Sequence, residues 1–127
     1  RADGWNAAYL APDEFARVNQ VLNEWCEESG RDPRSLKRAV NITFNMALSE
    51  DDIPRQRELM RADWGPTADR IMGGALLCTP DQAVERILEY AAAGANEVNI
   101  ALRAPWQTEA LDAYLDEVMP AVRRALG

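Results

Sequence analysis

The sequence predicts an α/β protein in which parallel strands alternate with helices, as part of a larger (β/α) barrel. Two segments, 36–48 and 98–103, alternate apolar residues with small or polar ones, which is typical of strands. Helical apolar spacing follows Pro12 and Pro80, and each of these two segments ends at a glycine. Strand–helix–strand order produces parallel pairing, because the helix returns the chain to the end of the sheet from which it started.

The first element is predicted to be a short strand over residues 2–8, followed by a helix that begins near Pro12. Proline suits the first helical position, and the two acidic residues after it complement the helix dipole. Gly30 supplies a left-handed stop. The helix is expected to bury a single apolar stripe, formed by Phe15, Val18, Val21, Leu22, Trp25 and Cys26.

Residues 36–48 carry the clearest strand pattern, and two interpretations fit it. A half-exposed antiparallel strand would show this alternation. A barrel strand would show it too, with an apolar face against outer helices and a small, polar face lining the interior. The long helices on either side favour the barrel strand. The residues expected on the apolar face are Val40, Ile42, Phe44, Met46 and Leu48.

Residues 49–77 are the least regular part of the sequence. Helices are expected over 51–60 and 66–72, and Gly73-Gly74 is predicted to form a mobile joint. The segment is longer than a simple connection needs, so either a lid over a site or an insertion explains it.

The last part of the chain repeats the helix–strand–helix pattern. Thr79-Pro80-Asp81-Gln82 is a capping box that opens a helix ending at Gly94. The strand 98–103 follows, and then a final helix that Pro120 is expected to kink. The predicted order of elements is therefore β-α-β-α(α)-β-α.

The composition describes an ordinary globular domain and argues against several functions. The 127 residues suit one domain, with 47% hydrophobic and 28% charged residues. The net charge of −7 argues against nucleic-acid binding, which needs a basic surface, and no apolar run is long enough to cross a membrane. Acidity is the usual bias of cytosolic enzymes, so a cytoplasmic location is expected.

The absence of histidine restricts the chemistry more than any other count. It removes Ser-His and Cys-His nucleophile pairs, histidine metal sites and imidazole general bases. Chemistry must therefore use carboxylates, cysteine, tyrosine or a cofactor, or depend on residues outside this chain. No catalytic residue and no metal site is predicted, and Cys26 and Cys78 are expected to be reduced.

Four short motifs, in this order and approximate spacing, resemble the bacterial luciferase-like family of flavin and deazaflavin monooxygenases. They are Ala2-Asp3-Gly4-Trp5-Asn6, Gly30-Arg31-Asp32-Pro33, Thr79-Pro80-Asp81-Gln82 with its helix end at Ala93-Gly94, and Val118-Met119-Pro120. Cys78 stands where the family usually has glycine. The resemblance covers nearly the whole chain but only the C-terminal part of those proteins. It implies that residues 1–127 form the last three strand–helix units of a (β/α)8 TIM barrel.

The resemblance implies an oxidoreductase or monooxygenase that uses FMN or a deazaflavin coenzyme and acts on a small-molecule substrate. In such barrels the site lies at the carboxyl ends of the strands. Much of the family's cofactor cradle lies in N-terminal strands outside this chain, so the chain is expected to be inactive alone. The alternative is a non-catalytic, self-associating α/β module with a structural or interaction role.

Four residues are the candidate cofactor contacts. Asn6, Asn45 and Arg103 lie near the ends of the three predicted strands and face the mouth if the barrel forms. Asn45 suits a hydrogen bond to a flavin or a substrate, and Arg103 suits a phosphate or carboxylate. Trp5 is either a wall for an aromatic cofactor or a core residue.

Other loop residues have less specific interpretations. Trp64 and Trp106 suit either a lid or substrate wall, or surface packing. Asp51 and Asp52 suit a metal site only with a third ligand, and the sequence places none near them. A solvated helix start is therefore the preferred interpretation of that pair.

A three-strand parallel piece leaves two open edges and an uncovered inner face. Unpaired strand edges favour pairing with another chain, and parallel sheets are normally covered on both faces. The chain is therefore expected to associate with itself, as a homo-oligomer, or with the missing N-terminal barrel segment.

Overall fold

The computed structural model describes residues 3–105 and 107–127 of the chain. At its centre is a parallel sheet in which the long strand β2 (Lys37–Phe44) lies between β1 (Gly4–Ala8) and β4 (Glu97–Ala101). The two-residue strand β3 (Ala75–Leu76) pairs with the end of β2. Every strand pair is parallel, as the sequence predicted, so the antiparallel interpretation of residues 36–48 is wrong. The short β3 was not predicted.

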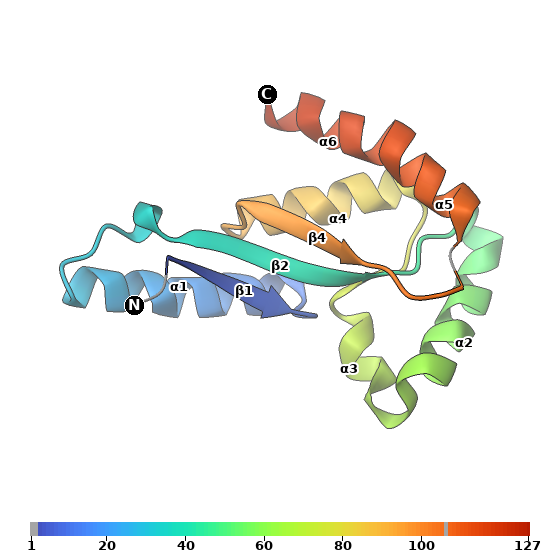
Figure 1. The fold of residues 1–127 in the computed structure, drawn as a ribbon, viewed down its shortest axis with the longest axis horizontal. Helices are drawn as coiled ribbons and strands as arrows, with labels where there is room; N and C mark the ends of the chain where they lie inside the picture. Colours follow the sequence, from blue (N-terminus) through green and yellow to red (C-terminus); the bar gives the residue numbers. More distant parts are fainter. Residues whose placement is uncertain (1–2, 106) are drawn as a thin grey trace.

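Helices cover one face of this sheet. In Figure 1, α1 (Pro12–Glu28) and α4 (Pro80–Ala92) lie behind the strands. The C-terminal helical segment packs against α4 and consists of α5 (Thr108–Ala113), a π-helical turn (Tyr114–Val118) and α6 (Met119–Leu126). None of the described helices is both long and apolar enough to span a bilayer.

The remaining helices lie beyond the carboxyl ends of the strands. They are α2 (Ile53–Trp64) and α3 (Ala68–Met72), which the strand arrowheads point toward in Figure 1. Short 3₁₀ turns at Pro33–Ser35, Glu50–Asp52 and Gly65–Thr67 precede β2, α2 and α3. The irregular segment is therefore two helices placed at the end of the sheet where parallel α/β sheets bind ligands.

Local sequence signals account for the helix boundaries. The helix α1 starts at Pro12, and Gly30 follows its end with φ 76°. The capping box of α4 forms, with the Thr79 backbone N–H donating to Gln82 Oε1 at 3.0 Å. A kink was expected at Pro120, because proline lacks an N–H and its ring crowds the preceding turn. The structure has a π-helical turn at Tyr114–Val118, just before Pro120.

The core lies between the sheet and the covering helices. The predicted apolar face of β2 is buried through Met46, but Leu48 is exposed because β2 ends at Phe44. The single apolar stripe predicted for α1 divides in two. Phe15 and Cys26 are buried, whereas Trp25 and other members of the stripe remain partly or largely exposed. The largest fully buried core side chains are Tyr90, Phe15, Ile42, Met46, Met60, Leu76, Val40 and Val118.

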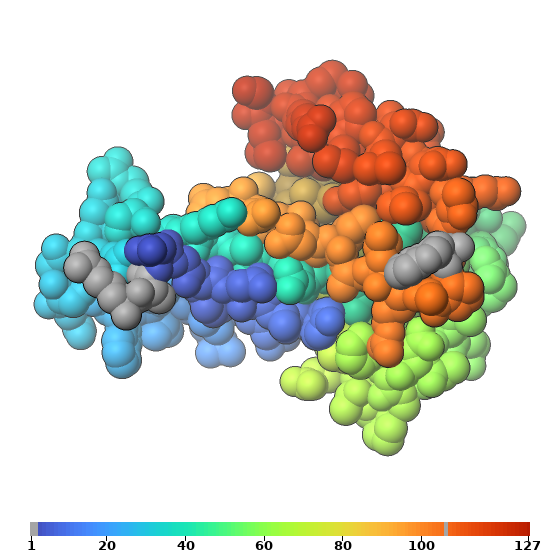
Figure 2. Space-filling model, in the orientation of Figure 1, coloured from blue at the N-terminus to red at the C-terminus, as the bar shows by residue number. Residues whose placement is uncertain are grey.

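The opposite face of the sheet has no helical layer, as expected for the interior of an incomplete barrel. Residues of β1, β2 and β4 lie on the surface in Figure 2. Polar contacts cross this face between strands, with Lys37 Nζ 2.8 Å from Glu97 Oε2 and Asn99 Nδ2 donating to Asn41 Oδ1 at 3.3 Å. At the carboxyl end the face is covered, because α2 and the loop after β4 enclose the last residues of β2.

Candidate functional site

A cavity of the described residues lies at the carboxyl ends of β2 and β4. Its volume is about 670 Å³, and its walls come from the end of β2, from α2 and from the loop between β4 and α5. This is the end of a parallel sheet at which barrel enzymes place their sites, because the strand–helix loops converge there.

Two of the predicted contact residues line this cavity together. Asn45 is buried just after β2, and its backbone N–H donates to the Leu76 carbonyl at 3.3 Å. Arg103 is exposed just after β4, and its guanidinium carbon lies 4.7 Å from the centre of the Trp64 ring. Trp64 in turn contacts Tyr9 edge to face, with ring centres 5.3 Å apart. This stacking orients a cation at the rim of the cavity.

The other two predicted contacts lie elsewhere. Asn6 is exposed in the middle of β1, where its register partner is Ala39, two residues before the strand ends. Trp5 points to the helical side and stacks on Phe15, with ring centres 5.0 Å apart and planes at 22°. That position matches the core interpretation of Trp5, because odd positions of β1 face α1. Trp64 takes the packing role described above, and Trp106 lies outside the described residues.

Two residues of the cavity wall were not predicted. Gln56 on α2 is 1% exposed and Thr43 on β2 is 3% exposed. The Gln56 amide nitrogen donates to Gln107 Oε1, but Gln56 Oε1 and Thr43 Oγ1 are the buried side-chain polar atoms of the described chain without a hydrogen-bond partner. An unpartnered buried polar atom costs about 1–3 kcal/mol, and such atoms concentrate at functional sites.

Several ionisable groups of the described residues have pKa values that differ from their usual ones. Arg55 donates to Asp52 at 2.6 Å, and this hydrogen bond holds the pKa of the Asp52 carboxyl below its usual value. Burial raises the pKa of the Cys78 thiol to about 11 and that of the Tyr90 hydroxyl to about 12. Both cysteines are free, and no group of three metal-ligating side chains occurs in the described ranges. The polar side chains of the cavity suit the binding and orientation of a ligand, and Asp52, Asp63 and Glu109 place carboxylates on its wall.

The replacement Thr43→Val is expected to stabilise the protein by about 1 kcal/mol, because it removes a buried hydroxyl that has no partner. Thermal unfolding should show the midpoint rising by about 4 °C for a chain of this size. Thr67→Val is the matched control, since the Thr67 hydroxyl donates to the Trp64 carbonyl at 2.8 Å and its loss should not stabilise. A lower midpoint for Thr43→Val would contradict the expectation.

Parallel strands with an open polar face, helices on the other face and a cavity at the strand ends define part of a (β/α) barrel. No family profile matches the sequence, and no curated protein matches it. Solved structures do share the fold. An F420-dependent secondary alcohol dehydrogenase, in complex with an F420-acetone adduct, matches with a TM-score of 0.73 and 19% identity, over 95% of this chain and 43% of that chain.

Two further structures match in the same way. The coenzyme F420-dependent tetrahydromethanopterin reductase of Methanopyrus kandleri has a TM-score of 0.65 and 18% identity, over 94% of this chain and 45% of its own. The EDTA monooxygenase of Chelativorans sp. BNC1 has a TM-score of 0.70 and 13% identity, over 97% of this chain and 42% of its own.

These three proteins are luciferase-like TIM barrels, so the fold that the sequence resemblance implied is confirmed. The chain spans less than half the length of each of them. At these identities the likeness concerns the fold.

Proposed function

We propose that this chain is part of a flavin- or deazaflavin-dependent oxidoreductase of the luciferase-like type. The observation that carries the proposal is the cavity of about 670 Å³ at the carboxyl ends of β2 and β4, in a fold shared with F420-dependent enzymes. The rest of the cofactor cradle would come from the N-terminal part of the barrel, and the chain alone would be inactive. We propose a cytoplasmic location for the complete protein.

The residues of the cavity suit such a cofactor. Arg103, held on the Trp64 ring, offers a guanidinium at the rim that fits a phosphate or carboxylate. Asn45 lines the same wall and offers an amide to the polar edge of a flavin ring. A bound flavin or deazaflavin supplies two-electron hydride chemistry, and the residues of this chain bind and orient it. This division of work agrees with the absence of histidine.

The experiment is a fluorescence titration of the chain with FMN and with riboflavin, which lacks the phosphate. FMN is expected to bind about tenfold more tightly, because one charge-assisted hydrogen bond to Arg103 contributes about 1.5 kcal/mol. The replacement Arg103→Gln should remove this preference and leave riboflavin binding unchanged. A 5-deazaflavin titrated in the same way measures the preference between the two cofactor types.

The control is Arg61→Gln, because Arg61 is an exposed arginine of α2 that pairs with Glu58 at 2.6 Å and lies outside the cavity wall. This variant should keep the preference for FMN. If the Arg103→Gln protein still bound FMN about tenfold more tightly than riboflavin, the role given to Arg103 would be contradicted. No quenching by any flavin, even when the upstream segment of the barrel is present, would contradict the cofactor site as a whole.

The second candidate function is a self-associating α/β module without catalysis. The observation that favours it is the largely exposed Trp25 on α1, beside a strand edge that no described residue pairs. A module of this kind would show self-association and no flavin affinity, so the same titration separates the two candidates.

A further inference from the structure

A polar groove lies at the amino ends of β2 and β4, at the opposite end of the sheet from the cavity described above. Its volume is about 450 Å³, and its walls come from α1, from the turn before β2 and from the connection between α4 and β4. The strand β2 has a partner strand on each side. The groove is therefore formed by neighbouring units of the chain itself.

Arg38, the second residue of β2, places a buried positive charge in this groove. The residue is 6% exposed, and none of the ion pairs among the described residues includes it. Its guanidinium donates from Nη1 to Asn19 Oδ1 and from Nη2 to the Pro33 carbonyl, each at 2.6 Å. Buried charges are normally paired, because neutral acceptors offset only part of the cost of leaving water. Within the described part of the chain, this cation has no anionic partner.

Part of the Arg38 guanidinium is available for a further bond. A guanidinium carries five N–H donors, and two of those of Arg38 have acceptors among the described residues. The fully buried side-chain atoms without a partner are Thr43 Oγ1 and Gln56 Oε1. Arg38 Nε, which has no acceptor either, is therefore reached by solvent. Nε–H is one arm of the fork with which guanidinium groups bind phosphate and carboxylate oxygens.

We propose that the groove binds a small oxyanion, a phosphate or a carboxylate group, on the guanidinium of Arg38. Side-chain amides of Gln20, Asn23 and Asn96 line the same groove, and amide N–H groups donate to oxyanions. Asn96 is held in place for this role, because its Oδ1 accepts from the Arg38 backbone N–H at 2.9 Å. Its amide nitrogen therefore remains as a donor.

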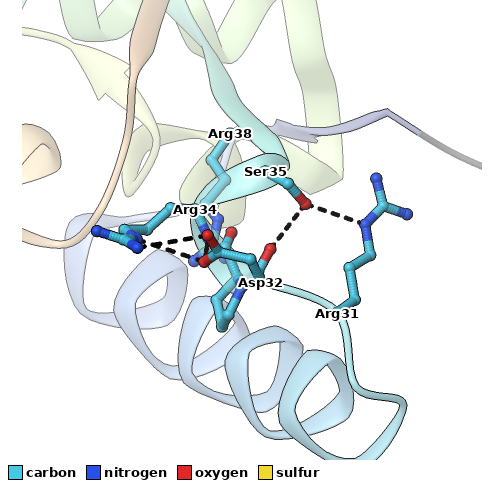
Figure 3. A network of polar contacts seen from close by, with 6 residues as sticks. Arg31, Asp32, Arg34, Ser35 and Arg38 are labelled. Atoms are coloured by element: carbon cyan, nitrogen blue, oxygen red, sulfur yellow. Dashed lines mark hydrogen bonds and ion pairs between the residues drawn. The ribbon is translucent and has the colours of Figure 1, made fainter.

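Two further charged side chains of the groove set the expected affinity. Arg34 is paired with Asp32, Nε to Oδ1 at 3.3 Å (Figure 3), so it adds little net charge. Glu27, exposed at the end of α1, is the one carboxylate among the described residues that line the groove, and it opposes the binding of an anion. We expect a dissociation constant on the order of 1 mM, as about two charge-assisted hydrogen bonds provide.

The test is a titration of the protein with inorganic phosphate at constant ionic strength, balanced with sodium chloride. The NMR signals of Arg38 Nε–H and of the backbone amides of Arg38 and Asn96 should shift and reach saturation. Sodium acetate is the second arm, and the tighter of the two anions identifies the occupant as a phosphate or a carboxylate group. Signals that shift no more with either anion than with chloride would overturn the proposal.

The replacement Asn96→Asp identifies the groove as the site. It keeps the acceptor for the Arg38 N–H and adds a carboxylate beside the cation, so the dissociation constant should rise at least about tenfold. Asn99→Asp is the matched control, because it changes the net charge equally on the open face of the sheet, where Asn99 contacts Asn41. It should leave the dissociation constant unchanged. Equal effects of the two replacements would overturn the proposal.

The replacement Glu27→Gln separates a bound anion from a counter-ion within the chain. It should tighten phosphate binding about threefold, as the loss of one exposed charge does, and leave the thermal midpoint in chloride unchanged. A clear fall of that midpoint would show that Glu27 is the counter-ion of Arg38 and would overturn the proposal. Circular dichroism establishes that each variant is folded.

The replacement Arg103→Gln keeps this inference distinct from the proposed function. Arg103 lies at the carboxyl end of the sheet, so the phosphate-dependent shifts at Arg38 should be the same in this variant. Phosphate shifts that disappear in Arg103→Gln would overturn the assignment of the anion to the groove. Flavin binding without these shifts at Arg38 would overturn the present proposal and leave the cofactor site intact.

Discussion

Replacing Asn19 with leucine should lower the free energy of unfolding by about 3 kcal/mol, because a buried cation loses an acceptor. Arg38 Nη1 donates to Asn19 Oδ1 at 2.6 Å, and the two residues are 6% and 8% exposed. Because Arg38 is only 6% exposed, water replaces little of the lost hydrogen bond. The thermal midpoint should fall by about 10 °C.

The size of this effect follows from how the charge of Arg38 is compensated. Its other guanidinium bond goes to the Pro33 carbonyl, at 2.6 Å, and among the described residues it forms no ion pair. Pro33 belongs to the turn drawn in Figure 3, which is held by hydrogen bonds among Asp32, Arg34 and Ser35. The charge of Arg38 is therefore compensated by two neutral oxygens, Asn19 Oδ1 and the Pro33 carbonyl. Losing either one removes about half of this compensation.

A double-mutant cycle with Arg38→Met separates this explanation from a packing defect. If Asn19 acts as the acceptor for the guanidinium, its replacement should cost little once Arg38 is methionine, giving a coupling energy of about 1.5–3 kcal/mol. Asn23→Leu is the matched control on the same helix, because Asn23 lines a surface groove together with Arg38 but is only half-buried, and its effect should stay within about 0.5 kcal/mol. Additive effects in the cycle would contradict the interpretation.

The elements that the sequence predicted best are those with long regular patterns. The alternation across 36–48 extends over a full strand, and Pro12 and the Thr79 capping box each begin a helix of 13 residues or more. The short β3 has only two residues and no alternation, so its pairing depends on β2 rather than on its own sequence. The apolar residues of α1 were identified correctly, but they were expected to be buried as one stripe. Periodicity alone does not determine which part of a wide apolar helix face is covered by another element.

The candidate site was predictable where a residue follows directly from a strand end. Asn45 and Arg103 line the cavity because both come just after strands whose carboxyl ends converge. Asn6 was expected at the carboxyl end of its strand, but it lies in the middle of β1, which continues to Ala8. Gln56 had no sequence signal, because α2 carries polar residues on several faces and only the fold determines which one meets the cavity.

Gly74, which the sequence suggested as part of a mobile joint with Gly73, is buried against the turn that follows β1. A β-carbon added to Gly74 would lie 2.1 Å from the carbonyl carbon of Tyr9 and 2.3 Å from its oxygen. Tyr9 cannot move aside easily, since it adopts φ 60° and its N–H is bonded to the Asn41 carbonyl at 2.8 Å. The Gly74 carbonyl also accepts from the Thr43 N–H, so a shift of this glycine disturbs the pairing of β2.

The replacement Gly74→Ala should therefore destabilise the protein by about 3 kcal/mol or more, as overpacking against backbone does at its upper range. Chemical denaturation measures this as a lower midpoint with an unchanged slope. The neighbouring Gly73→Ala is the matched control, because Gly73 has helical φ and ψ of −61° and −31° and an added β-carbon meets no atom closer than 3.5 Å. That change should stabilise the protein by about 0.5 kcal/mol through the unfolded chain. Equal effects at the two glycines would show that chain flexibility, and not the contact with Tyr9, determines the choice of glycine at position 74.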